Sequence, residues 1–135
     1  MKILVIDGQG GGLGKQLVAA VRAACSEAEI TAVGTNSMAT SAMLKAGADN
    51  AATGENAVVV GCREADVILG PIGMVIADAL FGEITPRMAV AIGQSRAKRI
   101  MIPMNHCNNV IAGMTEQPVG RLVQSAVSQL KDLMG

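Results

Sequence analysis

The sequence has almost no aromatic side chains: one Phe and no Tyr or Trp in 135 residues. Single-stranded nucleic acids usually stack on aromatic side chains, so this mode of binding is excluded, as is any mechanism that needs a tyrosine acid. Eleven basic and eleven acidic residues give a net charge of zero. Surfaces that bind nucleic acids or anionic membranes usually carry an excess of Lys and Arg. We therefore expect no nucleic-acid partner and no membrane partner.

Cysteine is also scarce. Cys25, Cys62 and Cys107 are an odd number with no close pair, which argues against a disulfide framework and favours a reducing cytoplasm. The opening segment MKILVIDG is too short for a signal peptide, and the apolar stretch at 67–81 is too short for a spanning helix. We expect a cytoplasmic protein.

Half of the residues are apolar, and they are arranged in alternating strand-like and helix-like segments. The aliphatic run KILVID at 2–7 is typical of a central parallel strand that is buried on both faces. Further strands are predicted at 29–33, 66–70 and 98–104, with a short last one at 110–114. Helices are predicted at 13–25, at 37–46 with Ser37 as N-cap, at 73–81, at 85–95 with Thr85 as N-cap, and at 119–133.

The segment at 50–65 is ambiguous, since Thr53 could begin a helix or 58–62 could form a strand; we favour the helix. The alternation predicts an α/β protein with a single doubly wound, mostly parallel, Rossmann-like sheet of about five or six strands and helices on both faces. We expect one domain over residues 1–135. Because the predicted helix at 73–81 is apolar nearly all round, we expect it to form a subunit interface in a homo-oligomer.

The most informative segment is DGQGGGLGK at 7–15, where the first strand turns into the first helix. Glycines in this position let the backbone approach a phosphate, and the helix N-terminus offers unpaired N–H groups. The G-x-G-x-x-G pattern does not fit, because Leu13 takes its sixth position, and the Walker pattern fails at Gln9 and Gln16. The alternative is that the glycines only permit close packing, but four of them in five residues exceed what packing needs.

The spacing that does fit is Gly8-x-x-x-Gly12-x-Gly14. This resembles the G-x-x-x-G-x-G turn of the short-chain dehydrogenase/reductase superfamily, over roughly the first 35 residues. The resemblance implies that the turn holds the pyrophosphate of NAD or NADP. It does not extend to catalysis, because that superfamily uses a tyrosine and a lysine four residues on, and this chain has no tyrosine.

Further candidates follow from the rule that ligands of open α/β sheets lie beyond the carboxyl ends of the strands. Thr53–Asn56 joins this edge if a short strand precedes it. The sequence lacks an acidic residue after the second strand to bind the ribose hydroxyls, so NADP is favoured over NAD. The predicted cofactor-binding residues are Gly8, Gln9, Gly10, Gly11, Gly12, Leu13, Gly14, Lys15, Thr35, Asn36, Gly70, Pro71, Ile72, Gly73 and Asn105.

Cys107 and His106 are the candidate catalytic residues, as a nucleophile and as a general acid or base. Adjacent side chains of an extended segment point to opposite faces, so a direct pair would need a turn there. A small semi-buried thiol is the alternative for Cys107. Asp7 could orient a ligand hydroxyl or magnesium, or cap the glycine turn. Glu83 is expected only to solvate its loop.

Several segments spread over most of the chain carry a second resemblance. They are DGQGGGLGK at 7–15, VGTN at 33–36, ATSAMLKAGAD at 39–49, ATGENA at 52–57, GPIG at 70–73, GEITPRMA at 82–89 and IPMNHCN at 102–108. Taken together, they resemble a bacterial family of small uncharacterised Rossmann-like proteins, a domain of unknown function. The resemblance implies a Rossmann-like fold and nucleotide binding, with no assigned activity.

Three functions stay open. We favour a small protein that binds a dinucleotide, NAD(P) by preference, as a reductase subunit or a redox sensor. The second is an enzyme acting on a phosphorylated or nucleotide-linked metabolite, with Cys107 or His106 as the reactive group. The third is a non-catalytic oligomeric scaffold whose apolar helix recruits a partner.

Overall fold

A computed structural model describes residues 1–104 and 108–135. Five parallel strands form one sheet with the order β3-β2-β1-β4-β5. This confirms the predicted α/β fold with a doubly wound sheet. The strands are β1 (Lys2–Asp7), β2 (Glu29–Gly34), β3 (Asn50–Thr53), β4 (Val67–Pro71) and β5 (Lys98–Ile102).

The central strand β1 owes its position to its sequence. All of its residues from Ile3 to Asp7 are buried, as expected of a strand covered on both faces. In the register of the sheet, Ile3 lies between Ile30 of β2 and Val67 of β4. The hydrophobic run at 2–7 therefore determines the middle of the sheet, and the more exposed strands β3 and β5 form its edges.

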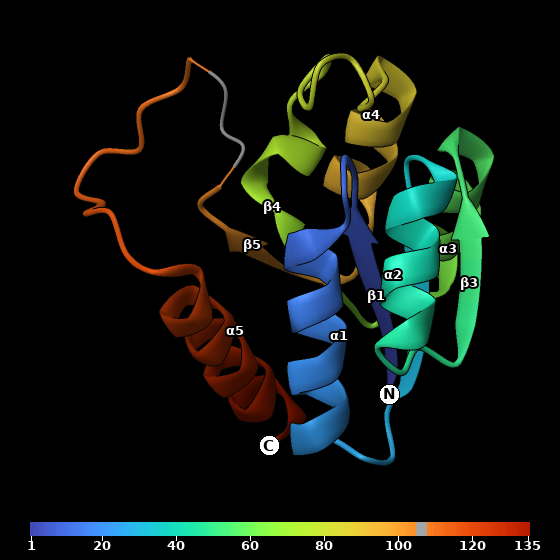
Figure 1. The fold of residues 1–135 in the computed structure, drawn as a ribbon, viewed down its shortest axis with the longest axis vertical. Helices are drawn as coiled ribbons and strands as arrows, with labels where there is room; N and C mark the ends of the chain where they lie inside the picture. The colour runs from blue at the N-terminus through green and yellow to red at the C-terminus, as the bar shows by residue number, and fades with distance from the viewer. Residues whose placement is uncertain (105–107) are drawn as a thin grey trace.

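Helices cover both faces of the sheet (Figure 1). One face packs against α1 (Gly12–Ala24), α2 (Ser37–Lys45) and α5 (Val119–Met134). The other face packs against α3 (Glu55–Glu64), the short 3-10 helix η1 (Ile72–Val75) and α4 (Pro86–Gln94). The chain runs from β1 outward to β3 and then returns to β4 on the far side of β1, so the strand order reverses between β1 and β4.

The prediction of an apolar helix at 73–81 is wrong. Only η1 at its start is helical, and the chain then continues in turns to residue 83. Asp78, Leu80 and Phe81 have left-handed backbone conformations, with φ of 69°, 58° and 56°, which an α-helix cannot accommodate. Met74 and Leu80 are buried in the chain's own core, so the apolar character of this segment largely reflects internal packing rather than a subunit interface.

The other predicted strands, helices and N-caps agree with the structure in part. The ambiguous segment at 50–65 contains the short strand β3 followed by α3, so our preference for a helix is right for its second part. The short strand predicted at 110–114 is wrong, since these residues lie in turns and irregular structure. Thr85 caps α4 as predicted, by accepting a hydrogen bond from the Met88 N–H. The N-cap of α2 is Asn36 rather than Ser37.

Candidate functional site

The strand order reverses between β1 and β4. Doubly wound sheets bind their ligands beside such a reversal, at the carboxyl ends of the strands. The turn between β1 and α1 lies there. Asp7, the last residue of β1, is paired in register with Gly34, the last residue of β2. The segments that the sequence predicts to converge, at 8–15 and at 35–36, therefore do meet.

Asp7 anchors the glycine turn. Among the described residues it is the polar side chain buried in the core, at 3% exposure. Its two carboxylate oxygens accept hydrogen bonds from the Gly8 N–H at 2.8 Å and the Gly14 N–H at 2.6 Å. Burial raises the pKa of Asp7, while these backbone hydrogen bonds act in the opposite direction. Of the roles considered for Asp7, the structure assigns the cap of the turn.

The glycines of the turn divide into two groups. A Cβ on Gly8 would lie 2.6 Å from the Thr35 hydroxyl, one on Gly11 2.7 Å from the Ala39 Cα, and one on Gly14 2.7 Å from the Asp7 Cβ. Gly11 also has a φ of 76°, which favours glycine. Close packing therefore accounts for these three positions.

Gly10 and Gly12 belong to the second group, because a Cβ on either would have no atom within 4 Å. Both are exposed, and within the described parts of the chain neither N–H has a hydrogen-bond acceptor. Gly12 is the first residue of α1, and the first N–H groups of a helix have no carbonyl partner within that helix. Packing therefore does not require glycine at these two positions. Glycine would be required there if a ligand approached the bare backbone.

At the end of β2, Asn36 joins two parts of the site. Its side-chain oxygen accepts the Ala39 N–H, which caps α2, and its amide nitrogen donates to the Gln9 carbonyl at 2.9 Å. Thr35 and Asn36 are half-buried beside the glycine turn. The Gln9 backbone is left-handed, with a φ of 51°. The structure therefore brings Thr35 and Asn36 to the turn, as predicted.

Glu83 completes this cluster, so the expectation that it only solvates its loop is wrong. Its Oε1 atom accepts hydrogen bonds from the Gln9 N–H at 2.8 Å, from the Asn36 amide at 3.0 Å and from the Thr35 hydroxyl. Partial burial raises the pKa of Glu83, but the three hydrogen bonds outweigh it and hold the pKa below its ordinary value. Glu83 lies 48 positions after Thr35, so no local spacing could have indicated the contact.

The end of β4 contributes less surface than predicted. Gly70, Pro71 and Gly73 are buried, and a Cβ on Gly70 would lie 2.6 Å from the Ile6 carbonyl oxygen. Only Ile72 of this group is half-buried. The four residues lie at the expected edge of the sheet, but the glycines there serve the packing of β4 against β1.

The segment Thr53–Asn56 joins the same edge, because β3 precedes it. Its Glu55 carboxylate accepts a hydrogen bond from the Thr85 hydroxyl at 2.6 Å and lies 3.7 Å from the Arg87 guanidinium. The start of α3 is thus tied to the start of α4, and Glu55 acts on the fold rather than on the glycine turn.

The candidate catalytic residues Cys107 and His106, and the candidate binding residue Asn105, lie outside the described residues. Their roles stay predictions. Within residues 1–104 and 108–135, no three His, Cys, Asp or Glu side chains are grouped so that they could hold a metal ion. Cys25 and Cys62 are free and buried, as expected for structural thiols, and burial raises the pKa of Cys62 to about 11.

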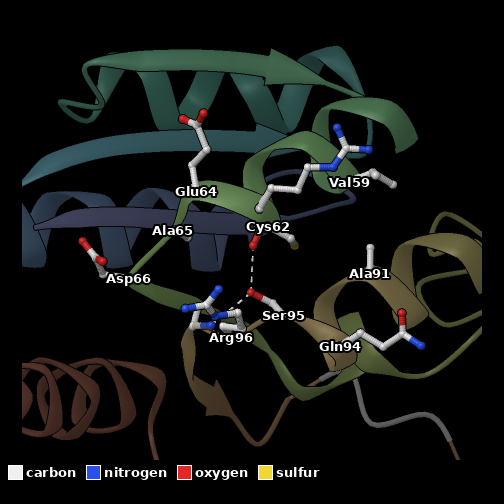
Figure 2. A pocket seen from close by; sticks show the side chains of 11 residues that line it. Val59, Cys62, Glu64, Ala65, Asp66, Ala91, Gln94, Ser95 and Arg96 are labelled. Atoms are coloured by element: carbon white, nitrogen blue, oxygen red, sulfur yellow. Dashed lines mark hydrogen bonds between the residues drawn. The ribbon is translucent and has the colours of Figure 1, made fainter.

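A cavity of about 740 Å³ lies elsewhere, between the carboxyl ends of α3 and α4 (Figure 2). Cys62, Asp66 and Arg96 are among the residues that line it, and Ser95 donates a hydrogen bond to the Cys62 carbonyl there. Asp66 directly precedes β4, which places this cavity at the amino edge of the sheet. It is therefore separate from the glycine turn.

Among the helices that the structure describes, none is long and apolar enough to cross a membrane.

Comparison with known protein families identifies the family of this chain. Residues 2–135 match the family described as Domain of unknown function (DUF3842). The chain belongs to this family. No curated protein matches its sequence.

Two solved structures are similar to this family member. One is a dodecameric FMN-dependent Ubix-like decarboxylase from Escherichia coli O157:H7, with 18% identity, a TM-score of 0.49, and coverage of 97% of this chain and 76% of that one. The other is apo saccharopine dehydrogenase (L-Glu forming) from Saccharomyces cerevisiae, with 14% identity and a TM-score of 0.49. That match covers 89% of this chain and 23% of that one.

Proposed function

We propose that this protein binds a dinucleotide of the NAD(P) type at the carboxyl edge of its sheet, and that it works as a reductase subunit or a redox sensor. The observation that carries the proposal is the pair of open glycines, Gly10 and Gly12, whose N–H groups point to no acceptor within the described residues. Two bare N–H groups at a helix N-terminus are suited to a pyrophosphate.

The surrounding residues support a nucleotide rather than a free anion. The polar groups of Thr35 and Asn36 lie at the end of β2, where a Rossmann-type sheet holds the adenosine ribose. Lys15 is exposed in the first turn of α1 and can approach a phosphate from the helix side. Ile72 directly follows β4 and is half-buried, so its exposed part offers apolar surface at the same edge.

Thermal unfolding tests the proposal directly. The protein is heated with NADH, NAD, NADPH, NADP, ATP, GTP or FMN at millimolar concentration. A ligand at 100 times its dissociation constant adds about 2.7 kcal/mol to the free energy of unfolding, which raises the Tm by roughly 10 °C for a chain of this size. We expect this shift with at least one of the four nicotinamide dinucleotides. A shift with ATP or GTP alone, or none at all, would contradict the proposal.

A substitution at Gly12 locates the binding. Gly12→Ala places a methyl group in the open space in front of the helix N-terminus, so we expect dinucleotide affinity to fall about tenfold or more while stability is kept. The matched control is Gly93→Ala in α4, where a Cβ also has no atom within 4 Å. Unchanged affinity in Gly12→Ala, measured by calorimetric titration, would place the ligand elsewhere.

We further propose that the protein is cytoplasmic and forms a homo-oligomer. The free thiols of Cys25 and Cys62 are consistent with a reducing compartment. Met38, Val90 and Val110 expose 68%, 53% and 94% of their surface, which leaves apolar area for contacts between copies. Light scattering on the purified protein should give a multiple of 13.7 kDa, and a monomer mass would refute the assembly.

A further inference from the structure

The carboxylate of Glu83 occupies the place at which dinucleotide-binding sheets hold the adenosine ribose. It lies beside the end of β2, in contact with Thr35 and Asn36, and a Cβ on Gly8 would be 2.8 Å from its Oε1 atom. The sequence has no acidic residue directly after β2. The structure brings one to that position from the loop between β4 and α4.

The loop that carries Glu83 is firmly held. Leu80 and Ile84, on either side of Glu83, are 2% and 0% exposed. Backbone hydrogen bonds close the loop on itself, among them Asp78 N–H to the Ile84 carbonyl at 2.7 Å and Glu83 N–H to the Leu80 carbonyl at 3.2 Å. The left-handed backbone at Asp78, Leu80 and Phe81 costs free energy, and strain of this kind is concentrated at functional sites.

The three hydrogen bonds to Glu83 leave half of its carboxylate available. All of them are accepted by Oε1, while Oε2 has no donor among the residues that the structure describes. Oε1 is thus used to fix the side chain, and Oε2 can accept a hydrogen bond from a ligand hydroxyl. No Lys or Arg in the described part of the chain forms an ion pair with Glu83.

Glu83 thus carries a negative charge that no ion pair among the described residues neutralises. Asp7 lies close enough to Glu83 for the two carboxylates to repel each other, and both accept hydrogen bonds from backbone N–H groups of the glycine turn. A ribose 2′-hydroxyl can donate to such a carboxylate, whereas a 2′-phosphate has no proton to donate and carries the same sign of charge. From this geometry we infer that Glu83 is the specificity-determining residue of the site, and that it selects an unphosphorylated ribose, that is, NAD(H) over NADP(H). The inference rests on the proposed function and reverses the preference predicted from the sequence.

The test is a calorimetric titration of the full chain with NADH and with NADPH. We expect the wild-type protein to bind NADH about tenfold or more tightly than NADPH, the effect of one charge-assisted hydrogen bond. Glu83→Gln removes the charge with little change in shape, so it should weaken NADH, tighten NADPH and reduce the ratio at least severalfold. Glu83→Asp keeps the charge and should still bind NADPH more weakly than NADH.

The matched control is Glu27→Gln, an exposed glutamate in the loop before β2, at the opposite edge of the sheet, which should leave both affinities unchanged. Circular dichroism shows whether each variant is folded. The ratio of the NADH and NADPH affinities of the wild-type protein can be measured even if a variant does not fold. Equal binding of the two cofactors, or tighter NADPH binding, by the wild type would overturn the inference while leaving the proposed function in place. So would tighter binding of both by Glu83→Gln, since the carboxylate would then be blocking the site. Binding of neither cofactor by any variant would overturn the proposed function itself.

Discussion

At the scale of single residues, the candidate site is organised by two carboxylates with opposite electrostatic behaviour. Burial dominates at Asp7 and raises its pKa, whereas at the less buried Glu83 the hydrogen bonds from Thr35, Gln9 and Asn36 prevail over burial and lower it. The ionised form of Glu83 is thus favoured in the folded state. Because the pKa of Glu83 differs between the folded and unfolded states, the stability of the protein depends on pH.

The free energy of unfolding should show this dependence at acid pH. Because the folded-state pKa of Glu83 lies below its ordinary value of 4.5, its contribution to stability is present above pH 4.5 and is lost as the pH falls through the folded-state value. We expect wild type to be about 1 kcal/mol more stable than Glu83→Gln at pH 7, with the difference shrinking below pH 4.5.

Urea denaturation of the two proteins over pH 3–7 measures this difference, and comparing them at each pH removes most contributions that both share. Glu27→Gln, at the opposite edge of the sheet, serves again as the control variant. A difference between wild type and Glu83→Gln that stays constant across this range would mean that the ionised carboxylate does not stabilise the fold.

The glycine turn shows what the sequence could and could not supply at this scale. Its glycines predict a turn that a phosphate can approach, but the spacing alone cannot distinguish glycines that pack from glycines that are open. Gly8 and Gly14 belong to the matching pattern, yet neighbouring atoms already require glycine there. Only the neighbours in space identify Gly10 and Gly12 as the open positions.

At the scale of elements, the segment after β4 is the main difference between prediction and structure. Its apolar residues at 73–81 have the composition of a buried helix. The structure instead uses η1 and a series of left-handed residues, which turn the chain back over the glycine turn. Periodicity cannot indicate such a conformation, because the strain is compensated by burial of Leu80 and Ile84 and by contacts with β1 and β2.

Substitution of Phe81 measures this strain. Phe81 has a φ of 56° and is 99% exposed, so its side chain contributes no burial that would be lost. Phe81→Gly should therefore raise the free energy of unfolding by about 1 kcal/mol.

Leu80→Gly is the matched control, because Leu80 has nearly the same φ of 58° but is only 2% exposed. Loss of its burial should outweigh the relief of strain, for a net destabilisation of about 2 kcal/mol or more in urea denaturation. If Phe81→Gly proved as destabilising as Leu80→Gly, the phenyl ring would be packed against something in solution.

At the scale of the whole molecule, α5 closes one face of the sheet against α1 and β5 (Figure 1). Leu130 and Leu133 are three residues apart in this helix, which is the spacing of one apolar face. The structure separates them, since Leu130 is 0% exposed and Leu133 is 42% exposed at the end of the helix.

Truncation of the two leucines should show this separation. Leu130→Ala leaves a cavity in the core between α5 and the sheet, so we expect a loss of about 2–5 kcal/mol in the free energy of unfolding. Leu133→Ala removes the same atoms from a partly exposed position and should cost less than about 1 kcal/mol. Equal losses in urea denaturation would show that the helix end is buried against another copy of the chain.

The architecture follows from the order and composition of the segments in the sequence. Aliphatic runs of five or six residues, separated by amphipathic helices, specify buried parallel strands, and parallel strands joined through helices leave few possible topologies. The glycine turn, the cap at Thr85 and the helix α5 are local patterns, so they too could be predicted. Only the tertiary structure brought Glu83 to Thr35 and Asn36, because that contact depends on how strained turns fold one loop over another strand's end. Long-range contacts between polar groups leave no period in the chain, so only the folded protein places this carboxylate beside the glycine turn.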